Sequence, residues 1–90
     1  MNNICIITMS RIDEAETIAR LLEEISANNE VRIIILTGLE GCLKGIEMAS
    51  HVMACQQLVV VRKHDGTIST VCEKLVNLAA ETETKIYYFD

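Results

Sequence analysis

With 90 residues, half of them hydrophobic, and a net charge of −5, the chain is long enough for one domain. It is too acidic for a domain that binds nucleic acid mainly through the phosphate backbone. Its longest apolar runs have four residues, which excludes a transmembrane helix of about 20 residues. No positive charge precedes the first apolar run, so we expect a cytoplasmic protein without a signal peptide.

The four cysteines are Cys5, Cys42, Cys55 and Cys72, with no C-x-x-C motif and no histidine pair at metal-ligand spacing. We therefore predict reduced thiols that pack as small apolar side chains, with no metal site. Cys42 is the one thiol with an alternative role, since it lies where a helix is expected to begin, and free backbone N–H groups there favour a thiolate.

The strand expected at residues 32–37 organises the rest of the chain. Its residues Ile33, Ile34, Ile35 and Leu36 are apolar without alternation, which is typical of a parallel strand covered on both faces. Gly38 ends this strand, and a loop with two further glycines, at positions 41 and 45, leads into a helix.

Further strands are predicted at 4–8, 58–61 and 86–89, and helices at 13–27, 42–55 and 68–82, from apolar runs and from apolar residues spaced by three and four. In the second helix this spacing places Leu43, Ile46, Ala49 and Met53 on one face, with Val52 beside it, and Lys44, Glu47 and Ser50 outside. For the helix ends, the expected caps are Ser10 or Asp13, Asn28-Asn29 in a left-handed conformation, and Thr67 or Ser69.

The element order βαβαβαβ predicts one domain over residues 1–90, a three-layer α/β/α sandwich of the flavodoxin-like or Rossmann-like kind. Right-handed crossovers and the strand order 2-1-3-4 place the first helix on one face of the parallel sheet and the other two helices on the opposite face. One helix, ~10 Å wide, covers about half of a sheet ~19 Å across. We therefore expect a homodimer or a partner protein on the half-covered face.

Polar residues collect in the loops at the carboxyl ends of the first three strands, where parallel sheets bind ligands. Helix N-termini point to the same edge, so these loops predict a site for a small anion such as a phosphate, nucleotide or carboxylate. Equally, turns and caps require these residue types without any ligand. The candidate binding residues are Thr8, Ser10, Arg11, Thr37, Gly38, Gly41, Lys63, His64, Asp65 and Thr67, with Lys44 close by.

Enzyme signatures are missing, because no G-x-S-x-G, dinucleotide or Walker A motif is present. The leading interpretation is a non-enzymatic regulatory or interaction module. The sequence does not identify a cofactor. The alternative is a small enzyme or phosphotransfer component that uses the same loops, with Lys63, His64 and Asp65 as its polar groups and Cys42 as an outside candidate.

Residues 31–75 resemble the second half of a DRTGG-type regulatory domain. The resemblance lies in Ile34-Ile35-Leu36-Thr37-Gly38, an apolar helix, Val59-Val60-Val61, and the stretch from Asp65 to Val71. The motif that gives the family its name is absent. Such domains accompany phosphotransacetylases and some pyrophosphatases and also occur alone, so the resemblance implies a dimerising, ligand-sensing module without catalysis.

Overall fold

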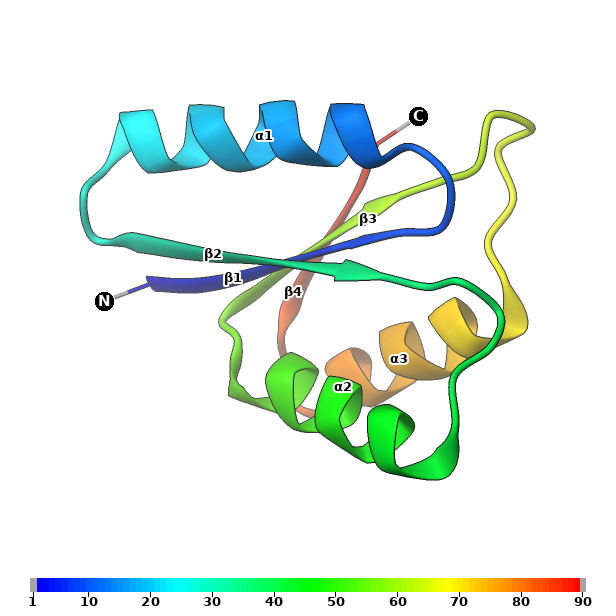
Figure 1. The fold of residues 1–90 in the computed structure, drawn as a ribbon. Helices are drawn as coiled ribbons and strands as arrows, with labels where there is room; N and C mark the ends of the chain where they lie inside the picture. Colours follow the sequence, from blue (N-terminus) through cyan, green and yellow to red (C-terminus); the bar gives the residue numbers. More distant parts are fainter. Residues whose placement is uncertain (1, 90) are drawn as a thin grey trace.

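The computed structural model describes residues 2–89, which form a four-stranded, all-parallel sheet with three helices (Figure 1). The strand order is β2-β1-β3-β4, so the α/β class and the predicted order 2-1-3-4 are confirmed. No helix within the described residues is long and apolar enough to cross a bilayer. The elements are β1 (Asn2–Thr8), α1 (Ile12–Ile25), β2 (Asn29–Ile35), α2 (Cys42–Ala54), β3 (Gln57–Val61), α3 (Thr70–Glu81) and β4 (Lys85–Phe89).

The helices divide between the two faces of the sheet as predicted. In Figure 1, α1 covers one face, whereas α2 and α3 lie together on the other. The α2–α3 side holds the larger buried cluster, which includes Ile7, Val60 and Leu75. On the α1 side the buried cluster is smaller and consists of Ile6, Ala15, Ala19 and Val61. The core is therefore thin where a single helix covers the sheet.

The central apolar run is less buried than expected, because β2 is an edge strand. Its side chains alternate between the two sides, with Ile34 buried toward α2 and Ile33 packed on the α1 side. Ile35 stays partly exposed, and the strand ends there rather than at residue 37. An edge strand lacks the neighbour that would cover its outer flank, so a continuous apolar run need not be fully buried.

The helix ends agree with the sequence at one of three positions. Ser69 caps α3, since its hydroxyl accepts the Cys72 N–H at 3.2 Å. The cap of α1 is Arg11, without a side-chain hydrogen bond, rather than Ser10 or Asp13. Neither Asn28 nor Asn29 is left-handed; instead the Asn29 side chain donates to the Leu22 carbonyl at 2.7 Å and so satisfies the end of α1.

The predicted buried face of α2 is wrong at Leu43, Ile46 and Met53. Val52 is buried and Ala49 partly buried, and Lys44, Glu47 and Ser50 are exposed as predicted. Met48 and Val52 are the buried residues of the helix, while Leu43, Ile46 and Met53 face solvent. A connection of only residues 55 and 56 joins α2 to β3, and it buries the Cys55 side chain. Met48 and Val52 join one buried cluster with Leu75 of α3, so packing against the sheet and α3 buries the Met48 side rather than the Leu43 side.

Candidate functional site

Arg11 follows the carboxyl end of β1, and its polar groups contact other residues of the chain. Its backbone N–H donates to the buried Thr8 hydroxyl at 3.0 Å. Its guanidinium lies 5.3 Å from the ring centroid of Phe89, and its Nε lies 3.5 Å from Glu14 Oε1. The guanidinium is therefore committed to an aromatic ring and a carboxylate, while the neighbouring Ser10 is exposed.

The loop after β2 is closed around its own carboxylate. Glu40 accepts the backbone N–H groups of Thr37 and Gly38, the latter at 3.1 Å from Oε2. Although desolvation acts to raise the pKa of Glu40, hydrogen bonds from its own N–H and from those two residues outweigh it and lower that pKa. The backbone N–H groups of Thr37 and Gly38, which an external anion would use, thus already bind the Glu40 carboxylate. Gly41 is the N-cap residue of α2.

The turn after β3 is also closed on itself. Asp65 accepts the Thr67 hydroxyl at 2.6 Å and the Thr67 N–H at 3.0 Å, and these bonds lower the pKa of Asp65. Gly66 has a φ of 80°, and its N–H donates to the Lys63 carbonyl at 2.8 Å. His64 lies close enough to Glu14 to influence that carboxyl electrostatically. Within residues 2–89 no ion pair joins Lys63 or His64 to Asp65.

The predicted site residues therefore form separate local networks at one end of the sheet. His64 lies near the Arg11–Glu14 pair, whereas the loop of Thr37, Gly38 and Gly41 has its own hydrogen bonds. Anion binding by these loops stays a prediction. Cys42 is exposed at the start of α2, and within residues 2–89 no group of three or more His, Cys, Asp or Glu side chains is placed to hold a metal ion.

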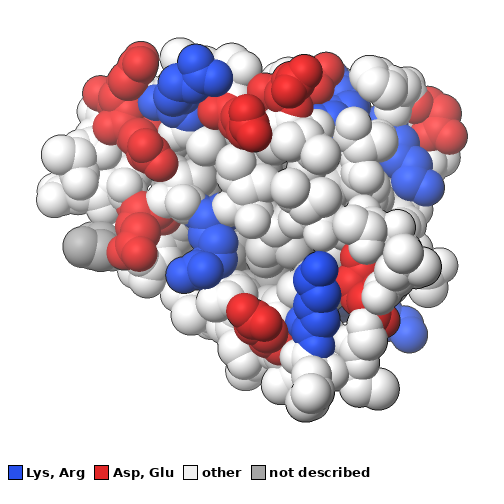
Figure 2. Space-filling view, in the orientation of Figure 1, with Lys and Arg blue, Asp and Glu red and all other residues white. Residues whose placement is uncertain are grey.

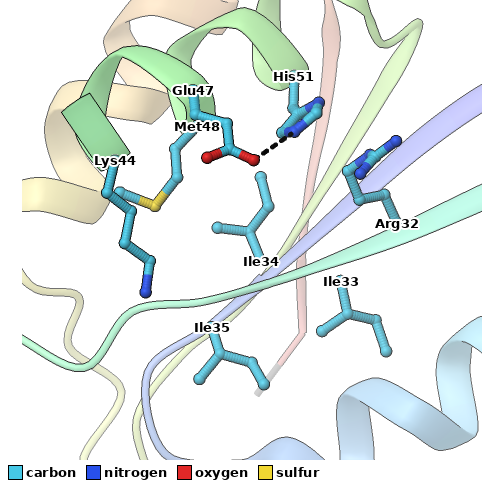
Figure 3. Close-up of a pocket in the computed structure, with 8 residues that line it drawn as sticks. All are labelled: Arg32, Ile33, Ile34, Ile35, Lys44, Glu47, Met48 and His51. Carbon is cyan, nitrogen blue, oxygen red and sulfur yellow. Dashed lines mark ion pairs between the residues drawn. The ribbon is translucent and has the colours of Figure 1, made fainter. Parts of the chain in front are cut away.

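A cleft that sequence reasoning missed lies between β2 and α2 (Figure 3). Its volume is about 280 Å³. Nε2 of His51 lies 3.7 Å from Glu47 Oε1 on one wall, and the floor is made of Ile34 and Met48. The rotation of α2 turns Met48 toward the sheet and leaves Lys44 and Glu47 exposed beside the cleft. Its lining residues are Arg32, Ile33, Ile34, Ile35, Lys44, Glu47, Met48 and His51.

Two thiols lie beside this cleft, at the end of α2. Cys5 Sγ donates to the His51 carbonyl at 3.4 Å, and Cys55 Sγ donates to the Val52 carbonyl at 3.1 Å. The interaction between the thiols, together with burial, raises the pKa of Cys5 far above its usual range. When the Cys5 S–H turns from the His51 carbonyl to Cys55 Sγ, it stabilises the Cys55 thiolate, and this interaction lowers the pKa of Cys55 to about 7. Both thiols line a second cavity, of about 170 Å³, which Arg32 and His51 share with the cleft.

No family model, no curated protein and no solved structure matches the chain. The resemblance of residues 31–75 to DRTGG-type domains is accordingly neither supported nor contradicted and stays a prediction.

Proposed function

We propose that the protein is a non-catalytic interaction module that forms a homodimer through the half-covered face of its sheet. The observation that carries the proposal is the exposure of large apolar side chains there: 54 % for Leu21, 49 % for Tyr87 and 39 % for Phe89. We expect it to act in the cytosol, where its four free cysteines stay reduced. The proposal agrees with what the DRTGG-type resemblance implies.

The three side chains border one continuous surface. The register of β3 and β4 pairs Val59 with Tyr87 and Val61 with Phe89, so both aromatic residues project to the α1 side. A groove of about 280 Å³ separates α1 from the end of β4, and Ile18, Leu21 and Phe89 form its apolar walls. Contiguous apolar surface of this kind usually marks a protein interface, because its hydration costs about 25 cal/mol per Å².

The charge pattern of α1 indicates how a second copy fits. The outward side of the helix carries Glu16, Arg20 and Glu23, all exposed, so a partner that lay over the helix would bury charges. A partner that lies beside the helix, over β3 and β4, meets the apolar walls of the groove, with Asp13, Glu14 and Thr17 on the helix side. Two packed sheets lie about 10 Å apart, so the β3–β4 half of a second copy has the depth of the layer that α1 occupies.

This arrangement is symmetric. A two-fold axis parallel to the strands packs the β3–β4 halves of two copies face to face and places Leu21 of each copy beside β4 of the other. A stable interface of this type buries about 1,200–2,000 Å² in total. Tyr87 and Phe89 lie at its centre, which is where aromatic side chains contribute most to binding.

The test is the molar mass in solution, measured by sedimentation over a range of protein concentrations. Wild-type protein is expected to be a dimer, and Leu21→Asp and Phe89→Asp are expected to be monomers, because each places a carboxylate in the apolar interface. Leu43→Asp is the matched control, since Leu43 is 85 % exposed on α2, on the other side of the sheet. A monomeric wild type contradicts the proposal, and so does a dimer that only Leu43→Asp dissociates.

A further inference from the structure

The outer edge of β2 carries unpaired backbone groups. β2 pairs only with β1, and the Leu36 N–H donates to the Thr8 carbonyl at 2.9 Å just beyond the end of the strand. N–H and C=O groups alternate in direction along a strand. Those of Ile33 and Ile35 therefore point away from β1, toward the open edge of the sheet. Such an edge is a template on which another extended chain can pair.

The cleft between β2 and α2 runs along this edge. Its strand side is formed by the four consecutive residues 32–35. The side chains of Ile33 and Ile35 point away from α2 (Figure 3), so these residues present the strand edge to the cleft. The helix side is formed by Lys44, Glu47, Met48 and His51, whose spacing of three, four and seven residues places them on one side of α2. The edge of β2 and the side of α2 that lies along it form a groove that suits an extended segment.

The charges of the groove favour an acidic partner. Arg32 and Lys44 lie at opposite ends of the floor in Figure 3, and within residues 2–89 neither forms an ion pair with a carboxylate. The one acidic residue of the groove, Glu47, faces His51. In Figure 2 charged side chains line the side of α1, and acidic and basic side chains also flank an uncharged patch below it. Two free cations beside apolar residues are notable in a chain of net charge −5.

We propose that this groove binds an extended segment of another protein, in which acidic and apolar side chains alternate, as a fifth strand on β2. Main-chain hydrogen bonds to Ile33 and Ile35 would supply affinity, as in other cases of strand addition to a sheet edge. Side chains on one face of an extended chain repeat about every 6.6 Å, so two carboxylates of one segment can reach separate cations. The groove lies at the edge opposite β4, so this site is independent of the dimer interface proposed above.

The test uses a labelled synthetic peptide of alternating valine and glutamate, with blocked ends and the length of β2, titrated by fluorescence anisotropy. We expect saturable binding that weakens with salt, with hydrogen-exchange protection gained at the Ile33 and Ile35 amides. Arg32→Glu and Lys44→Glu are expected to weaken binding roughly 5- to 30-fold, since each removes an attraction and adds a repulsion. Lys74→Glu, on the exposed side of α3, makes the same charge change away from the groove and should leave affinity within about twofold.

A second peptide, N-methylated at every backbone nitrogen so that neither of its edges can donate a main-chain hydrogen bond, separates strand addition from charge attraction. It keeps the carboxylates but cannot pair along an edge, so its binding is expected to be lost. The proposal is overturned if the N-methylated peptide binds as well as the first. It is equally overturned if Lys74→Glu weakens binding as much as the groove variants, if protection appears at β4 instead, or if wild-type protein does not bind the peptide at all.

Discussion

At the scale of single residues, Cys55 offers the clearest departure from ordinary chemistry. A hydrogen bond with Cys5 stabilises the Cys55 thiolate. Because this effect outweighs that of burial, the pKa of Cys55 falls from 9.0 to about 7. Burial alone raises the pKa of Cys72 to about 11. Because only the thiolate is nucleophilic, the two buried thiols should differ in how their alkylation depends on pH.

We predict that iodoacetamide labels Cys55 with a rate that rises through about pH 7 and levels off above it, whereas Cys72 stays unlabelled until the solution is far more alkaline. The measurement is mass spectrometry of peptides from Cys42→Ser protein, a background that removes the exposed thiol. Removing the Cys5 donor by Cys5→Ala should shift the Cys55 profile to higher pH. A Cys55 profile that is the same with and without the Cys5 thiol would contradict the assignment.

At the scale of elements, the start of α3 depends on one side chain. The Ser69 hydroxyl accepts the Cys72 N–H at 3.2 Å and satisfies one of the free donors of the first turn. We predict that Ser69→Ala lowers the free energy of unfolding by about 1 kcal/mol, measured by urea denaturation. Ser50→Ala is the matched control, because Ser50 lies in the middle of α2, is exposed to solvent, and donates its hydroxyl to the Ile46 carbonyl. Alanine is a better helix former, so that variant should lose no stability.

The elements and their order follow from the sequence, because alternation of strand and helix leaves few ways to build a parallel sheet. The rotation of α2 does not follow. Leu43, Ile46 and Met53 recur at helical spacing just as Met48 and Val52 do, so periodicity alone cannot choose between the two sides. The choice depends on packing against the sheet and α3, where Met48 and Val52 join one buried cluster, and this is a tertiary constraint.

The same constraint explains why the groove and the thiol pair were not predicted. Lys44 and Glu47 border the β2–α2 cleft only because α2 turns its Met48 side inward. Cys5 and Cys55 stand 50 positions apart in the sequence, so no motif spacing links them. In the predicted loops, by contrast, the polar groups bond within each loop, as Glu40 does with Gly38, which the residue types alone do not reveal.

At the scale of the whole molecule, thin coverage of the α1 face limits the stability of a single copy. Small domains bury a modest share of their surface, and here part of the apolar surface, including Leu21 and Tyr87, stays in water. A second copy that covers this surface binds only the folded chain, so it stabilises folding by mass action. Assembly and folding are therefore coupled in the proposed dimer.

This coupling predicts a melting temperature that depends on protein concentration. For a dimer of this length that unfolds to separate chains, each tenfold rise in concentration should raise the Tm by about 4 °C, from an unfolding entropy of about 2.1 cal/mol/K per residue. Differential scanning calorimetry between ~10 µM and ~1 mM measures the effect. Leu21→Asp changes an exposed residue, so the variant should fold but melt at one temperature throughout this range. If the wild-type Tm is equally independent of concentration, the exposed apolar face of the sheet contributes nothing to the stability of the fold.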